Sequence, residues 1–188
     1  RSRGLGDVYK RQIQYFLMVS LLCVLSCNQE KDKTTNNTAT IPVSKKKLNE
    51  KLVEANQRYV MRERDEINAF IKYRNWDMVE TGTGLRYMKT KKGVGDRAES
   101  GMVAEIKYSI ELLDGRVCYK TEEGETKKFL IDQDDVEKGL HEAIQYMNVG
   151  DIAIIILPSH LAHGLHGDEN IIPSLASVIY YVELINLE

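Results

Sequence analysis

Alternating hydrophobic and polar positions predict a β-rich domain in the C-terminal half of the chain. Between residues 102 and 113, apolar side chains alternate with mostly polar ones, as in a strand with one buried face. Residues 152–157 form an unbroken aliphatic run, which favours a central strand covered on both faces. Shorter apolar runs predict further strands at residues 85–89, 129–131 and 177–187.

One short helix is expected among these strands. Apolar residues recur at helical spacing from Val136 to Met147, and the acids Asp134 and Asp135 before them suit the positive end of a helix. Gly150 is expected to close the helix. The pattern predicts an α+β fold, with an antiparallel twisted sheet wrapped on one short helix and an N-terminal helical segment before it.

That helical segment spans residues 44–73. Ser44 is a suitable N-cap, and apolar residues recur at helical spacing from Leu48 to Ile71. Dense charge at residues 58–66 indicates a solvated helix face. We expect one or two helices, too thin to form a core of their own. They must pack on the following domain, form a homodimer through residues 44–73, or lack stable packing.

The start of the chain has the pattern of an export signal. Residues 13–25 are apolar but shorter than the ~20 residues that a membrane-spanning helix needs. The run ends at Ser26 and Cys27 in the manner of a bacterial lipobox, so we expect lipidation of Cys27 and a lipoprotein anchored to the membrane. A signal peptide with an incidental cysteine is the alternative. Asn28 after the cysteine favours the outer membrane, with the protein facing the periplasm.

The expected organisation has four parts. Residues 1–27 comprise a non-native start and the lipoprotein signal, although the basic residues at the start fit a genuine signal region as well. Residues 28–43 are a polar, flexible tether. Residues 44–80 are the charged helical segment, and residues 81–188 are the α+β domain.

Composition narrows the function. The net charge of -2 gives no basic footprint for nucleic acid. If Cys23 is removed with the signal and Cys27 carries lipid, Cys118 alone remains, and one thiol cannot form an internal disulfide.

The order of many residues along the last hundred positions resembles the FKBP-type peptidyl-prolyl isomerase family. The residues that carry the likeness include Tyr108, Leu113-Asp114-Gly115, Phe129, Val136, Gly139, Met147, Val149-Gly150, Leu157-Pro158, Ala162, Gly164, Gly167, Ile171-Ile172-Pro173 and Val182-Glu183-Leu184. The layout is similar to exported bacterial lipoproteins of a Bacteroidetes-like type, including members associated with gliding motility.

The resemblance implies catalysis of cis/trans isomerisation at bonds preceding proline, with no cofactor. The partners would be proline-containing segments of client proteins, and the role would be to assist folding of exported envelope proteins. An apolar pocket would strip water from the prolyl amide and bind its twisted form best.

The resemblance also places the site. The catalytic candidates are Tyr108, Val136, Glu137, Leu140, His163, Ile172 and Tyr180, with Glu137 acting through its backbone N–H. The substrate-binding candidates are Cys118, Tyr119 and Phe129. For the aromatic and aliphatic members, ordinary core packing is the competing interpretation, and His163 could equally be a surface histidine without a task.

Departures from the family leave alternatives open. Leu140 stands where the family has Trp, and Cys118-Tyr119 stand where it has an aromatic followed by Asp. A catalytically weak or inactive binding or chaperone lipoprotein is therefore the second hypothesis, and a structural lipoprotein is a third. His160, His163 and His166 recur every three residues, but the intervening glycines argue against a metal site.

Overall fold

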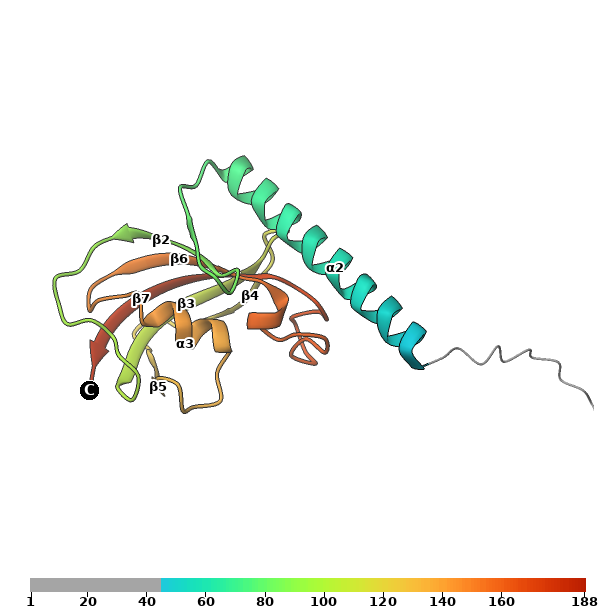
Figure 1. Cartoon of the computed structure of the whole chain (residues 1–188). Coiled ribbons are helices and arrows are strands. Elements are labelled where there is room, and N and C mark those ends of the chain that lie inside the picture. The colour runs from blue at the N-terminus through green and yellow to red at the C-terminus, as the bar shows by residue number, and fades with distance from the viewer. Residues whose placement is uncertain (1–44) are drawn as a thin grey trace, which may run out of the picture. The chain divides into compact units, whose positions relative to one another are not determined.

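The computed structural model describes residues 45–188, which form a curved sheet with a helix on each side (Figure 1). The expected non-native start, signal, lipidated Cys27 and tether, together with Ser44, lie outside the described residues. The elements are α2 (Lys45–Arg74), β1 (Val79–Glu80), β2 (Arg86–Lys91), β3 (Val103–Leu112), β4 (Val117–Lys120), β5 (Lys127–Leu130), α3 (Lys138–Ile144), β6 (Ile152–Leu157), the 3-10 helix η1 (Ser159–Leu161) and β7 (Val178–Leu187).

The strands form one seven-stranded antiparallel sheet in the order β1-β2-β6-β7-β3-β4, with β5 also paired to β3. The aliphatic β6 is interior and pairs on both edges, as its sequence predicted. β3 and β7 are the long central strands, and the short polar β1 and β4 were not predicted. The α+β plan expected from the sequence, an antiparallel sheet wrapped on one short helix with a helical segment before it, is confirmed.

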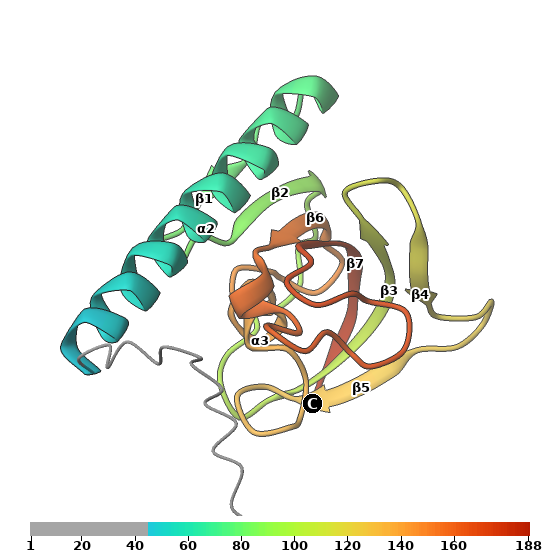
Figure 2. The ribbon, with the colours of Figure 1, turned by 90° about the vertical axis from the view of Figure 1, so that its right-hand side faces the viewer.

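Two apolar layers cover the two faces of the sheet. Figure 2 shows α3 inside the curve of the sheet and α2 outside it. The larger layer fills the concave side around α3, and it includes Leu140, Ile144 and Tyr180. The smaller layer joins the outer face to the C-terminal half of α2, where Ile67 is fully buried against Ile156. Burial of apolar area on both faces stabilises the sheet and fixes where α2 lies.

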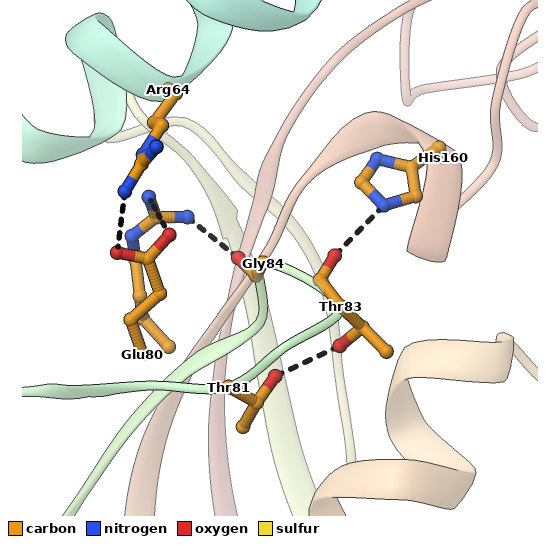
Figure 3. Close-up of polar contacts among 7 residues, drawn as sticks. Arg64, Glu80, Thr81, Thr83, Gly84 and His160 are labelled. Carbon is orange, nitrogen blue, oxygen red and sulfur yellow. Dashed lines mark hydrogen bonds and ion pairs between the residues drawn. The ribbon is translucent and has the colours of Figure 1, made fainter.

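α2 is one continuous helix of 30 residues, and its two halves have different surroundings. The C-terminal half packs on the sheet, whereas Leu48 and Leu52 in the N-terminal half are 49% and 59% exposed. Polar contacts add to the docking: Nη2 of Arg64 lies 3.3 Å from Oε2 of Glu80 (Figure 3). No helix among residues 45–188 is long and apolar enough to cross a membrane.

The structure corrects the predicted extent of the domain helix. α3 ends at Ile144, not beyond Met147, and Gly150 lies in a turn before β6 with a positive φ of 89°. The helix has no acidic residue in its first turn, because its N-cap is Glu137 rather than Asp134 or Asp135. The apolar spacing continued past the helix because Met147 reaches the same core from the following turn.

Candidate functional site

A pocket of about 320 Å³ opens on the concave side of the sheet, beside the N-terminal end of α3. We call it the central pocket. Strands β3 and β7 supply its floor, and residues 158–177, which we call the site loop, supply part of its wall. It is lined by Tyr108, Ile110, Tyr119, Lys127, Glu137, Leu140, His163, Asp168, Asn170 and Tyr180.

The floor of the central pocket is apolar and aromatic. The rings of Tyr108 and Tyr180 lie 6.1 Å apart at an angle of 37°, and Leu140 from α3 is buried beside them. Tyr180 is only 2% exposed, and burial followed by the nearby Glu137 carboxylate raises its pKa. The same two causes raise the pKa of Tyr108, so both phenols stay neutral and present ring faces to a ligand.

Glu137 contributes both its backbone and its side chain to the wall. As the N-cap of α3 it has extended backbone angles, and its N–H donates to no acceptor within residues 45–188. The resemblance gave a role only to its N–H, but its side chain lies in the site too, with Oε1 3.0 Å from Nε2 of His163. No well-directed hydrogen bond joins these two atoms, and Nε2 of His163 has no other partner among the described residues.

Asp168 is the most highly connected of the pocket residues that the sequence analysis missed, which also include Ile110, Lys127 and Asn170. Its Oδ1 accepts hydrogen bonds from the N–H groups of Asn170 at 3.0 Å and Ile172 at 2.7 Å. Its Oδ2 accepts a hydrogen bond from the Tyr119 hydroxyl. Burial would raise the pKa of Asp168, but these bonds outweigh it and lower the pKa. The sequence Asp168-Glu169-Asn170 is typical of a turn, and it was the one signal in the sequence that could have pointed to Asp168.

Four of the predicted residues do not line the central pocket. Val136 lines a neighbouring hollow of about 430 Å³ that shares Glu137 and His163 with it. Ile172 is 2% exposed in the core, where its N–H is held by Asp168. Cys118 and Phe129, predicted to bind substrate, are buried as well, with the Phe129 ring against the imidazole of His141. Strand alternation turns Cys118 in β4 and Phe129 in β5 into the core rather than toward the pocket.

The loop histidines face different partners. Nε2 of His160 lies 3.1 Å from the carbonyl oxygen of Thr83 (Figure 3). His163 faces Glu137 instead. Across residues 45–188, no group of three His, Cys, Asp or Glu side chains is arranged to hold a metal ion. Burial, the first of several causes, raises the pKa of the Cys118 thiol, which therefore stays protonated at neutral pH.

Comparison with known proteins shows which family and which relatives this sequence is similar to. Residues 95–185 match the family described as FKBP-type peptidyl-prolyl cis-trans isomerase. The FKBP-type peptidyl-prolyl cis-trans isomerase FkpA of Aeromonas hydrophila is 34% identical over 109 residues, which are 57% of this chain and 40% of that protein. Peptidyl-prolyl cis-trans isomerase FKBP11 of Bos taurus is 36% identical over 90 residues, or 48% of this chain and 44% of the relative.

A solved structure gives the same fold. The crystal structure of a peptidyl-prolyl cis-trans isomerase from Pseudomonas syringae superposes with a TM-score of 0.59 at 21% identity, covering 70% of this chain and 95% of that one. The chain spans 40% and 57% of the length of the first two curated relatives that it matches.

Proposed function

Because residues 95–185 match the model of the FKBP-type peptidyl-prolyl cis-trans isomerase family, we propose that this chain belongs to that family and catalyses isomerisation of peptide bonds preceding proline. The observation that carries the proposal is the central pocket, whose floor is formed by Tyr108, Leu140 and Tyr180. A prolyl ring fits against such a floor, which keeps water from one side of the amide.

Catalysis here needs differential binding rather than proton transfer. The amide barrier of ~18–20 kcal/mol arises from the partial double bond of C–N. A twisted amide has lost that resonance, so a pocket that binds it better than the planar form lowers the barrier. The N–H of Glu137 has no acceptor among residues 45–188, so it can donate to the substrate carbonyl while the prolyl ring packs against Tyr180.

A binding or chaperone module is the second candidate, favoured by the polar rim of the central pocket. Glu137, His163, Lys127 and Asp168 bring charge close to the apolar floor. Charged groups retain water, and water favours the planar amide. A domain of this kind would hold proline-containing segments without accelerating their isomerisation.

A coupled assay with a short Xaa-Pro peptide separates the two candidates. The full chain carrying Cys27→Ser is soluble if the lipid is the anchor, and it retains every pocket residue. Isomerisation well above the uncatalysed rate supports the enzyme. Saturable binding of the same peptide with uncatalysed kinetics would replace the enzyme proposal with the binding module.

We further propose that the chain is a lipoprotein of the bacterial outer membrane that faces the periplasm and assists folding of exported envelope proteins. The lipobox-like ending at Cys27 supports this location, and the isomerase domain supports the role. Expression in a bacterium with labelled palmitate should label the parent chain but not Cys27→Ala. Equal labelling of both would contradict the lipid anchor.

Finally, the exposed half of α2 supports a homodimer through residues 44–73. Leu48 and Leu52 lie one helical turn apart on the same side of α2, and both are solvent-exposed. Burial of this pair against a second copy would remove both side chains from water. Sedimentation of the chain should show a dimer that Leu48→Lys with Leu52→Lys dissociates; a monomeric parent would refute the dimer.

A further inference from the structure

The helix α2 reaches the isomerase site through one buried carboxylate. Glu63 is only 5% exposed, although its side chain ends in a carboxyl group. Its Oε1 accepts two hydrogen bonds, from the N–H of Ser159 at 2.7 Å and from the hydroxyl of Ser177 at 2.8 Å. A buried carboxylate is costly unless such donors meet it, so this arrangement requires all three residues together.

These two serines lie at the two ends of the site loop, where it leaves and rejoins the sheet. The paired strands β6 and β7 end at the pair Leu157 and Val178, and Ser159 and Ser177 lie just beyond this pair. Glu63 therefore extends the closure of the loop past the point where sheet pairing stops. One oxygen atom of a helix holds both ends of the loop together.

A second residue of α2 binds the same region one helical turn earlier. The hydroxyl of Tyr59 donates to the carbonyl of Leu175 at 2.7 Å and lies 3.3 Å from Oγ of Ser159. Glu63 and Tyr59 together thus contact the loop at three of its residues. We call these two side chains the helix staple.

The hydrogen bonds continue from the helix staple to the pocket wall. The N–H of Gly164 donates to the carbonyl of Ser159 at 2.8 Å, and the N–H of Leu175 donates to the carbonyl of Gly164 at 2.8 Å. Two of the three residues held by α2, Ser159 and Leu175, therefore bind Gly164, which directly follows the pocket residue His163. Asp168 lies in the same loop and also lines the central pocket.

From these contacts we propose that Glu63, assisted by Tyr59, is a positioning residue of the isomerase site, through which α2 holds the site loop over the central pocket. The inference rests on the proposed isomerase function and deepens it. Residues 95–185, which match the family, do not include α2. The helix thereby adds a support for the site that lies outside the family domain.

Independent docking of α2 makes the proposal testable. Ile67 is fully buried on the outer face of the sheet, and Arg64 pairs with Glu80. These contacts hold the helix in place when Glu63 is changed. A Glu63 variant can therefore loosen the site loop without releasing the helix.

The test compares the full chain with Glu63→Leu, Glu63→Gln and the control Glu66→Leu, whose residue is exposed on the same helix. Glu63→Leu removes the acceptor, so kcat/KM toward an Xaa-Pro peptide should fall about tenfold, since small misplacements of a site are costly. Hydrogen exchange should accelerate at residues 159–177 but not in β3. Glu63→Gln keeps an acceptor oxygen and should stay within about twofold of the parent. The control should match the parent in both measurements.

A folded Glu63→Leu variant with parental kcat/KM, or with parental exchange in the site loop, would overturn the proposal. If that variant does not fold, Tyr59→Phe is the second test, because it removes only one hydroxyl. This variant should lower kcat/KM about threefold and speed hydrogen exchange at residues 173–176. Parental values of both would again overturn the proposal. A parent chain without isomerase activity refutes the proposed function instead, and the exchange data still decide whether Glu63 holds the loop.

Discussion

The side chain of Tyr180 lies at the boundary between the hydrophobic core and the central pocket. It is almost fully buried, yet its ring lines the central pocket beside the ring of Tyr108. The sequence left two interpretations open for this residue, pocket wall and ordinary core. The structure places it in both roles, because a pocket floor in a small sheet domain is also the top of its core.

Tyr180→Phe and Tyr180→Ala should separate these roles. Phe keeps the ring and loses one hydroxyl near Glu137, so the free energy of unfolding should change by only about 1 kcal/mol and isomerisation should persist. Ala leaves a cavity and should cost about 3–5 kcal/mol, with loss of activity. Urea unfolding and the peptide assay measure both. An active, folded Ala variant would show that the floor is assigned wrongly.

Asp168 organises its loop through both carboxylate oxygens. Asp168→Ala removes the acceptor for two backbone N–H groups and for the Tyr119 hydroxyl. We expect unfolding free energy to fall by about 1–3 kcal/mol and kcat/KM to fall more steeply than stability predicts. The exposed neighbour offers a control, Glu169→Gln, which should resemble the parent. Unchanged kcat/KM in Asp168→Ala would remove the residue from the site.

Among the elements, α3 approaches the sheet unusually closely at Gly139. A Cβ atom there would lie 2.5 Å from Cδ2 of Leu157 in β6 and 2.9 Å from the carbonyl oxygen of Leu161. Helix propensity alone would make Gly139→Ala stabilising by about 0.5–1 kcal/mol. The contact reverses that sign.

We therefore expect Gly139→Ala to destabilise the domain by about 1–3 kcal/mol, because overpacking forces α3 away from β6. The shift should also move Leu140 and the Glu137 N–H, so activity should fall with stability. Gly82→Ala is the control, since nothing lies within 4 Å of the added atom. Thermal unfolding that shows Gly139→Ala as stable as the parent would contradict this account of the packing.

Periodicity predicted the elements whose burial is regular. β3 and β6 agree with their predicted ranges within a residue, because alternating or continuous burial along a strand leaves a direct trace in the sequence. β4 has four residues with mixed exposure, which is too short for a period to appear. α3 was predicted too long because Met147 is apolar for a reason unrelated to helix formation.

The resemblance named six residues that line the central pocket, from strands, helix and loop: Tyr108, Tyr119, Glu137, Leu140, His163 and Tyr180. Periodicity alone predicts the strands that carry Tyr108 and Tyr180, but not the contacts between distant segments. The pairs Asp168 with Tyr119 and Glu63 with Ser159 join segments that are 49 and 96 positions apart. Loop conformation decides such contacts, and no local pattern in the sequence encodes them.

At the scale of the whole molecule, buried carboxylates link stability to pH. The side chain of Asp151 is 1% exposed, 2.7 Å from Nζ of Lys89. It also accepts hydrogen bonds from the N–H groups of Gly93 at 2.6 Å and Asn148 at 2.8 Å. Burial would raise the pKa of Asp151, but Lys89 and the two N–H groups outweigh it, so the pKa lies below its usual value.

The sign of the pH effect follows from that direction. A carboxyl with a lowered pKa in the folded state stabilises the fold above its unfolded pKa of about 3.9, and this contribution is lost as pH falls through the folded value. Asp151→Asn should therefore lose about 1–3 kcal/mol of unfolding free energy at pH 7. The gap from the parent should narrow as pH falls below about 4, because the unfolded parent chain then binds a proton at Asp151 that the folded carboxylate, with its lowered pKa, does not bind. Urea unfolding at several pH values measures the gap, with the exposed Asp77→Asn as a control that should follow the parent. A gap in unfolding free energy that stays constant down to about pH 3 would mean that Asp151 contributes through packing rather than charge. The contacts of Asp151 with Lys89 in β2 and with the turn at Gly93 would then not depend on its ionisation.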